Sequence, residues 1–302
     1  MSAATFDAEW LRLRAPFDAA AGDRPGPAAL ARAFGTVLRR RRERGALRLL
    51  DLGGGVGANV CRLAPRIPGS QSWTIVDNDD ALLARLDATI AAWARRIGGR
   101  LVAIEGGVSV TTPQRIVTVV RCTHDLRDGL ADLPLAAADG VVASALLDLV
   151  SADWLERAAA ALAAHRLPCL FTLNVDRALR WRPAAADDAA IAAAFRRDLG
   201  RDKGFGHALG ADAGTAAATI LGARGYTVET AGSHWQIGAA DAAVHRAMLS
   251  FVVPAALRHE PDAAEARSWR RRVGVWQAAK VERIAAASLE LTVGHTDVLA
   301  AM

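Results

Sequence analysis

The glycine-rich stretch that follows an apolar run contains the residues whose types and spacing point most directly to chemistry. Residues 49–52 have the character of a short buried strand, and Gly53, Gly55 and Gly57 follow it. Glycines in such a turn let the backbone approach a ligand closely, because a side chain there would fill the ligand's space or forbid the required φ angles. A helix is expected from Asn59 onward, and its N-terminus offers free N–H groups to a carboxylate or phosphate. The stretch therefore predicts a site for a nucleotide-like cofactor.

Two cofactors compete for this turn. Gly53-x-Gly55-x-x-Ala58 satisfies the dinucleotide fingerprint, and Asp77 lies 24 residues after Gly53, near the spacing of a ribose-binding acid. An NAD(P)-dependent oxidoreductase is therefore one candidate. Asp51 favours another cofactor, because a carboxylate would repel a pyrophosphate but attract the α-amino group of S-adenosylmethionine.

The pattern of Asp51 and the three alternate glycines resembles the first motif of class I S-adenosylmethionine-dependent methyltransferases. Three further segments resemble later motifs of the same family and occur in the correct order. Each is a predicted buried strand followed by polar or turn residues, and they are residues 73–78, 115–126 and 140–149. Residues 201–206, with the sequence Arg-Asp-Lys-Gly-Phe-Gly, are similar to a segment of uncharacterised bacterial methyltransferases.

The resemblance implies a role in cofactor binding for ten residues. They are Asp51, Gly53, Gly55, Gly57 and Asn59 at the methionine end, Asp77 and Asn78 at the ribose, Asp125 and Leu126 at the adenine, and Ser144 near the methyl group. A carboxylate such as Asp77, at the end of a strand, suits the ribose because its two oxygens accept both hydroxyl groups.

Asp148 is the candidate catalytic residue, because it follows the fourth strand in the turn where many members of the family have an active-site group. As a base it would take a proton from a hydroxyl or an amine while the methyl group moves. Methyl transfer also gains much of its rate from positioning alone. The alternative is an acid at a helix N-terminus, stabilised by the helix dipole.

The acceptor is expected beyond the carboxyl ends of the strands, where ligands bind in such sheets. Residues 197–207, here called the cover segment, combine paired charges, glycines, an aromatic residue and a histidine. They suit a mobile lid over the acceptor, or equally a surface loop whose glycines serve turns. The candidate substrate-binding residues are Arg12, Arg14, Asp176, Arg177, Lys203, His207 and Trp235.

Composition and charge set limits on the class of protein. The chain has 302 residues with 52% hydrophobic residues and a net charge of +5, which is ordinary for a globular enzyme. A small-molecule acceptor is expected because the inserted segments have the character of a cover over the acceptor. An arginine run at residues 39–44 and a pI near 9.8 leave an RNA methyltransferase as an alternative. The same run is also typical of a solvated helix end, which favours cations, so nucleic acid is not the expected partner.

Other features of the sequence bear on location and metals. The three cysteines are isolated and are expected to be reduced, and no signal peptide or membrane span is evident, so a cytoplasmic protein is expected. No clustered histidine or cysteine spacing indicates a metal, although the magnesium-using catechol-type members of the family remain an alternative. The oligomeric state is not indicated.

Alternating strands and helices predict an α/β fold. The expected architecture is a doubly wound, seven-stranded, mostly parallel sheet, the Rossmann-like methyltransferase fold, with a last antiparallel strand and helical cap insertions. Residues 1–46 are expected as an N-terminal helical cap and residues 47–302 as the methyltransferase domain. Its insertions are expected at about residues 176–214 and 239–288.

Overall fold

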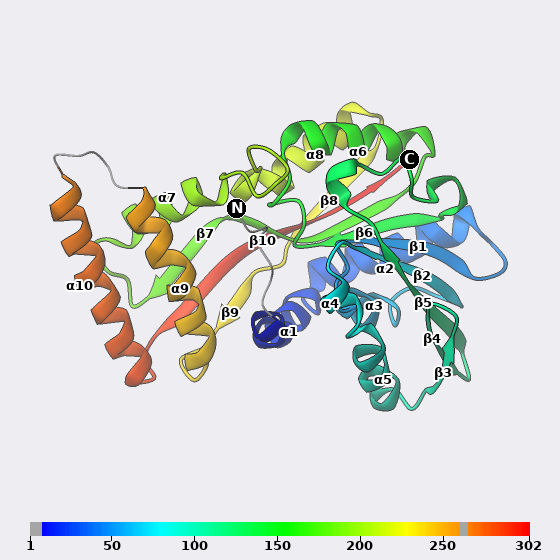
Figure 1. The fold of residues 1–302 in the computed structure, drawn as a ribbon, viewed down its shortest axis with the longest axis horizontal. Helices are drawn as coiled ribbons and strands as arrows, with labels where there is room; N and C mark the ends of the chain where they lie inside the picture. The colour runs from blue at the N-terminus through cyan, green and yellow to red at the C-terminus, as the bar shows by residue number, and fades with distance from the viewer. Residues whose placement is uncertain (1–7, 260–264) are drawn as a thin grey trace.

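The computed structural model describes residues 8–259 and 265–302, and a ten-stranded sheet forms its centre. The strand order is β3-β4-β5-β2-β1-β6-β7-β10-β8, and β9 pairs with β10 beside this path (Figure 1). The strands are β1 Leu47–Leu52, β2 Gln71–Asp77, β3 Arg100–Ile104, β4 Gly107–Thr112, β5 Arg115–Thr123, β6 Gly140–Ser144, β7 Cys169–Arg182, β8 Thr227–Gly232, β9 Trp235–Ile237 and β10 Glu290–Ala301.

The sheet confirms the predicted fold class. Strands β5, β2, β1, β6 and β7 are parallel neighbours, and β10 lies antiparallel between β7 and β8. This order is that of the seven-stranded Rossmann-like methyltransferase sheet expected from the sequence. The β3–β4 hairpin was also expected, and it extends the sheet beyond β5.

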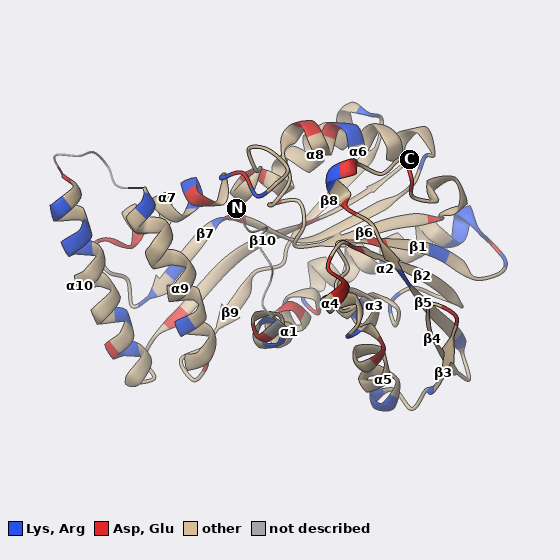
Figure 2. Ribbon diagram, in the orientation of Figure 1, with Lys and Arg blue, Asp and Glu red and all other residues tan. Residues whose placement is uncertain are grey.

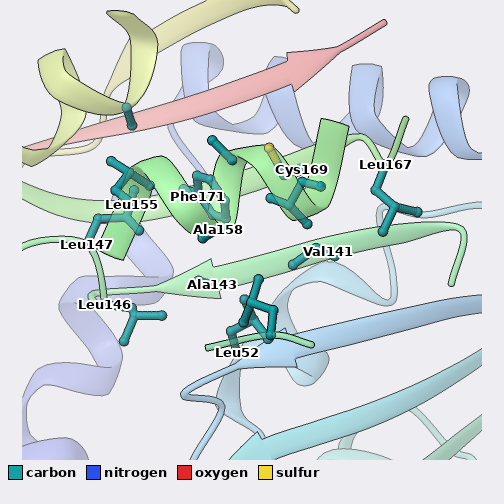
Figure 3. Close-up of a cluster of buried hydrophobic side chains, with 14 of the residues drawn as sticks. Leu52, Val141, Ala143, Leu146, Leu147, Leu155, Ala158, Leu167, Cys169 and Phe171 are labelled. Atoms are coloured by element: carbon teal, nitrogen blue, oxygen red, sulfur yellow. The ribbon is translucent and has the colours of Figure 1, made fainter. Parts of the chain in front are cut away.

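Helices cover both faces of the sheet, because its central strands are apolar on both sides. Helices α2, α3 and α5 share a buried cluster with β1 and β2 on one face, and α6 and α8 form a second cluster on the other (Figures 1 and 3). The helices are α1 Ala8–Gly22, α2 Pro25–Arg41, α3 Ala58–Leu63, α4 Asp80–Leu83, α5 Leu86–Arg96, α6 Ala152–Ala164, α7 Asp188–Leu199, α8 Ala213–Ala223, α9 Ala242–Arg258 and α10 Ala266–Ala285. The described helices include none that is both long and apolar enough to cross a membrane.

The far ends of two long strands carry a third hydrophobic cluster, away from the middle of the sheet. Figure 1 shows β7 and β10 running side by side toward α7, α9 and α10. Trp181 of β7 and Leu291 of β10 are buried there with residues of α7, α9 and α10, and α1 packs at its border. This confirms a mostly helical segment after residue 239, apart from residues 260–264, which lie outside the described residues.

The end of β7 differs from the sequence-based expectation. An insertion was expected to begin at about Asp176, but β7 continues to Arg182, where it pairs with Glu290 of β10. The apolar run ends at Val175, and the charged residues that follow resemble a loop in sequence. Pairing with a distant strand, which the local pattern does not reveal, keeps them extended.

Smaller differences concern breaks within elements. The helix expected after Asn78 is divided into α4 and α5, and the strand expected over residues 226–237 is divided into β8 and β9. Two N-terminal helices were expected over residues 5–45, and α1 and α2 fulfil this, with residues 5–7 outside the described part. Phe34 and Leu38 of α2 are fully buried in the core, so α2 is packed as firmly as the sheet's own helices.

Candidate functional site

The residues expected to bind the cofactor meet at one edge of the sheet. Strands β1, β2, β5 and β6 are parallel, so their carboxyl ends lie at the same edge. The glycine turn (residues 53–57) follows β1, Asp77 ends β2, Asp125 follows β5 and Ser144 ends β6. Parallel pairing therefore brings together groups that are up to 91 residues apart in the sequence, from Gly53 to Ser144.

The glycine turn is shaped by its backbone and by close packing. Gly53, Gly55 and Gly57 have φ angles of 63°, 51° and 78°, in the left-handed region that favours glycine. Gly54 is also required, which the sequence pattern did not indicate. A Cβ atom there would lie 2.8 Å from Ile75 Cγ2 and 3.0 Å from Asp51 Oδ2. The turn is therefore folded directly over the Asp51 carboxylate.

Asp77 connects the turn to the end of β2. Its Oδ2 accepts a hydrogen bond from the Gly55 N–H at 2.8 Å, and its Oδ1 accepts one from the Asp79 N–H at 3.0 Å. Burial raises the pKa of this carboxyl, and the two backbone donors oppose that rise. Each oxygen keeps a further lone pair, so the carboxylate has acceptors left for a diol.

Asp51 is a fully buried carboxyl group with one unsatisfied oxygen. The Asn59 Nδ2 donates to Asp51 Oδ1 at 3.1 Å, whereas Oδ2 has no hydrogen-bond partner. Burial raises the pKa of Asp51 to about 7, against the opposing effects of Asn59 and of the Arg62 guanidinium. An unpartnered buried carboxylate is costly, so this oxygen is suited to receive a cationic donor.

Asn59 is itself held by a residue that the sequence analysis missed. Arg62 lies one helical turn further along α3 and donates to Asn59 Oδ1 at 2.7 Å and to Thr172 Oγ1 at 2.9 Å. The available signal was a single cation in the otherwise apolar helix segment of residues 60–64. Such a residue in a buried helix requires polar partners.

The expected adenine residues lie close by but are already engaged. Arg127 forms a salt bridge with Asp125, and this hydrogen-bonded pairing lowers the pKa of Asp125 to about 2. The side chain of Leu126 is buried in the core, and its carbonyl accepts a hydrogen bond from Trp154 Nε1 at 2.6 Å. The Asn78 side chain, which follows β2, also helps to lower the pKa of Asp125.

Asp148 lies in the turn between β6 and α6, and it is buried with an unpartnered Oδ1. Burial raises the pKa of this carboxyl, and the nearby cations of Lys203 and Arg14 oppose the rise. Helix α6 begins after its N-cap Ser151, and the acid of its first turn is Asp153. The interpretation of Asp148 as a helix N-terminal acid is therefore wrong.

The cover segment is fixed to its surroundings by several contacts. Lys203 Nζ donates to the carbonyl oxygens of Leu199 at 2.7 Å and Asp148 at 3.3 Å. The ring of Phe205 packs edge-on against Trp154, with 5.9 Å between centroids. The segment therefore covers the β6–α6 turn, and it holds Lys203 beside Asp148.

Of the two candidate arginines of α1, only Arg14 joins the site. Arg14 is 9% exposed, pairs with Asp18 at 2.9 Å and lies over the Trp235 ring at 5.3 Å from its centroid. The Trp235 indole donates to Asp18 at 3.0 Å and packs against His295 at 4.7 Å between ring centroids. His295 was missed by the sequence analysis, and it is buried with an unpartnered Nδ1. Arg12 lies at the surface, near Glu9.

The other candidate substrate residues lie elsewhere. Asp176 and Arg177 line a groove of about 520 Å³ whose lining residues include none of the glycine turn, Asp77 or Asp148. Arg177 pairs there with Asp212 at 2.7 Å, and Asp176 lies 3.6 Å from His234. His207 is exposed. The structure therefore does not bring these three residues together with Arg14, Trp235 and Lys203.

The arginine run after α2 is largely used inside the fold. Arg39 donates to the Pro68 carbonyl at 2.8 Å, Arg41 to the His165 carbonyl at 2.8 Å, and Arg42 to Asp139 at 2.6 Å. A solvated helix end was expected; Arg40 and Arg44 are exposed, whereas the other three arginines bond oxygen atoms of the fold. The described residues contain no group of three or more histidine, cysteine or acidic side chains arranged to hold a metal. The three cysteines are free thiols.

Comparisons with known proteins find likeness only at the level of structure. No family model matches the chain, and no curated protein matches its sequence. A cyclopropane-fatty-acyl-phospholipid synthase-like protein from Lactobacillus casei has a TM-score of 0.48 and 13% identity, over 95% of this chain and 98% of that one.

Two further solved structures carry the methyl donor or its product. A SAM-dependent methyltransferase from Geobacter sulfurreducens, bound to S-adenosylhomocysteine, has a TM-score of 0.41 and 15% identity over 96% of this chain and 97% of that one. Phosphoethanolamine N-methyltransferase 2 from Haemonchus contortus, bound to S-adenosylmethionine, has a TM-score of 0.40 and 11% identity over 89% of this chain and 52% of that one. At TM-scores below 0.5 and identities of 15% or less, the likeness does not indicate the activity of this chain.

Proposed function

We propose that this chain is a class I S-adenosylmethionine-dependent methyltransferase that acts on a small-molecule acceptor. The observation that carries the proposal is the buried Asp51 carboxylate, whose Oδ2 has no partner beneath the glycine turn. The α-ammonium group of S-adenosylmethionine is a cationic donor that this oxygen can receive. A strand order typical of this class of enzyme supports the same assignment.

The residues at the sheet edge fit the rest of this cofactor. The glycine turn leaves room for the backbone to contact the methionine end, and Asp77 has lone pairs free for both ribose hydroxyl groups. Asp125 and Leu126 would border the adenine, with Arg127 as a competing partner of the Asp125 carboxylate. When bound, the cofactor supplies an electrophilic methyl group on a sulfonium ion.

The acceptor would lie between the β6–α6 turn and α1. Asp148 is buried there beside Lys203 and within the electrostatic reach of Arg14. Its raised pKa makes its ionised form a stronger base than an ordinary carboxylate, which suits removal of a proton from an acceptor hydroxyl or amine. Trp235 and the cover segment would exclude water and orient the acceptor.

The alternatives have less support from the residues. For an NAD(P)-dependent oxidoreductase, an ionised Asp51 beneath the turn would repel the pyrophosphate. For an RNA methyltransferase, a continuous basic surface is expected, but the run at residues 39–44 makes internal bonds. Figure 2 shows acidic residues beside basic ones on α6, whereas α10 carries more basic than acidic residues.

Calorimetric titration of the purified protein with S-adenosylhomocysteine is the first test. We expect binding in the micromolar range, no fluorescence change with NADH or NADPH, and no RNA binding at low salt. If the folded protein binds NADH or NADPH but does not bind S-adenosylhomocysteine, the cofactor assignment is overturned. Salt-sensitive RNA binding alongside cofactor binding would overturn the small-molecule acceptor.

A further inference from the structure

Arg62 lies where α3 meets three other parts of the fold. Its guanidinium donates to Asn59 on the same helix and to Thr172 of β7. The end of α1 lies against it as well, since a Cβ atom on Gly22 would be 3.0 Å from an Arg62 Nη atom. The side chain is therefore enclosed by the cofactor edge, the sheet and α1.

Arg62 is also the central cation of a buried charge cluster. Its positive charge favours the ionised forms of Asp51, of Asp18 on α1 and of Asp297 on β10. Arg14 is the other cation, paired with Asp18. Asp51 and Asp297 are buried and Asp18 is half-buried, and the Arg66 cation also lies near enough to act on Arg62. Asp51 keeps an oxygen without a partner, and this oxygen marks where a further cation would be received.

The hydrogen bonds of Arg62 also fix the direction of Asn59. A guanidinium only donates, so the Asn59 group that faces Arg62 must be the carbonyl oxygen. The Asn59 amide nitrogen then points to Asp51 Oδ1, where it is found at 3.1 Å. Without Arg62 the amide is free to turn over, and its oxygen would then face a carboxylate.

We propose that Arg62 is the positioning residue of the cofactor site, which orients Asp51 through Asn59 and supplies the nearby positive charge that keeps Asp51 ready to receive the cofactor's ammonium group. The inference rests on the proposed function. Asp51 is faced by Asn59 and Arg62 from α3 and by Asp77 from β2, and the last of these raises its pKa. Loss of Arg62 therefore moves the pKa of Asp51 upward, and cofactor binding then requires a higher pH.

The test is the affinity for S-adenosylhomocysteine between about pH 6 and pH 9, measured by calorimetry on the wild type, Arg62→Gln and Arg66→Gln. Arg66 is the charge control, because its guanidinium pairs with Asp23 and donates to the backbone carbonyl of Arg62, whereas the Arg62 guanidinium contacts Asn59 itself. In Arg62→Gln we expect affinity at pH 7 to fall about tenfold or more and to recover partly at pH 9. Arg66→Gln should keep the wild-type pH profile.

A second variant covers the case in which Arg62→Gln does not fold. Arg62→Lys keeps the cation, but an ammonium group does not reproduce the planar fork that contacts Asn59 and Thr172 together. We expect the wild-type pH profile with affinity several-fold lower, and unchanged affinity would overturn the orienting role. If the pH dependence of affinity is unchanged in Arg62→Gln, or shifts equally in Arg66→Gln, the role of Arg62 is overturned while the proposed function stands. A wild-type protein that binds no S-adenosylhomocysteine at any pH would instead overturn the proposed function.

Discussion

The backbone N–H of Gly55 donates a hydrogen bond to the Asp77 carboxylate across 2.8 Å, which ties the glycine turn to the end of the neighbouring strand. Asp77 therefore has two roles at the proposed site. It holds the glycine turn in its observed shape, and it would offer its remaining lone pairs to the ribose.

Replacement of Asp77 should weaken cofactor binding strongly. In Asp77→Asn, loss of charged hydrogen bonds worth about 1.5–3 kcal/mol should lower affinity for S-adenosylhomocysteine about 10- to 100-fold by calorimetry. Asp80→Asn is the matched control, since Asp80 is exposed at the start of α4 and bonds only Thr123. Equal affinities of wild type and Asp77→Asn would contradict the ribose contact.

Cofactor binding should depend on pH through Asp51. Its pKa is about 7, so below that value the carboxyl is increasingly protonated and no longer attracts an ammonium group. The affinity for S-adenosylhomocysteine should fall about tenfold for each pH unit below 7 and level off above it. An affinity that stays constant from about pH 5.5 to pH 8 would exclude Asp51 as the ammonium's partner.

The ligand-free protein should become more stable when Asp51 is neutralised. Burial raises the folded-state pKa from 3.8 to about 7, a cost of about 4 kcal/mol at most when the carboxyl is ionised. The folded state holds this proton more tightly than the unfolded chain, so the cost is absent below pH 3.8 and complete above about pH 7.

Asp51→Asn should therefore raise the midpoint of urea unfolding more at pH 8 than at pH 5, while abolishing cofactor binding. Asp77→Asn serves for comparison, because its half-buried carboxyl is already held by two backbone donors. A stability gain that is equal at both pH values would show that ionisation of Asp51 carries no cost in the fold.

Turnover should depend on Asp148. Asp148→Asn keeps the shape of the β6–α6 turn but removes the base, so turnover should fall about 100-fold or more while affinity for S-adenosylhomocysteine stays the same. Asp153→Asn, in the exposed first turn of α6, is the control. Turnover is measured with the acceptor that a small-molecule screen identifies. Unchanged turnover in Asp148→Asn would show that Asp148 does not remove the proton and that the turn contributes only by positioning the acceptor.

Local sequence patterns were sufficient to predict which residues meet at the carboxyl ends of the central strands. The glycine turn and Asp77 each lie at the end of an apolar strand, and parallel pairing alone then brings them together. The order of motifs along the chain therefore predicted the fold, and the structure brings most of the residues expected to bind the cofactor to one edge of the sheet. Asp51 was also found from its position before the turn, although only the structure reveals its unpartnered oxygen.

Contacts between distant segments could not be predicted in the same way. Arg62 and Asp297 lie 235 residues apart, and nothing in either local pattern indicates that both are buried in one charge cluster. The same holds for the pairing that extends β7 to Arg182, which depends on Glu290 of β10. Polar residues within apolar segments, such as Arg62, Asp297 and His295, indicate that these segments need polar partners, but they do not indicate which partners.

The stability of the cluster formed by α7, α9 and α10 should depend on a buried lysine that lies away from the residues expected to bind the cofactor. Lys280 of α10 is 1% exposed, pairs with Asp188 of α7 at 2.9 Å and lies over the rings of Trp181 and Trp276, which contact each other edge-on. Lys280→Ala would leave the Asp188 carboxylate without its cation and a void beside the two indoles. It should lower the free energy of unfolding by about 3 kcal/mol in urea and leave cofactor affinity unchanged. Arg283→Ala, on the exposed side of α10, should cost about 0.5 kcal/mol or less. Equal stability of the two variants would show that the cap is held by its apolar contacts alone.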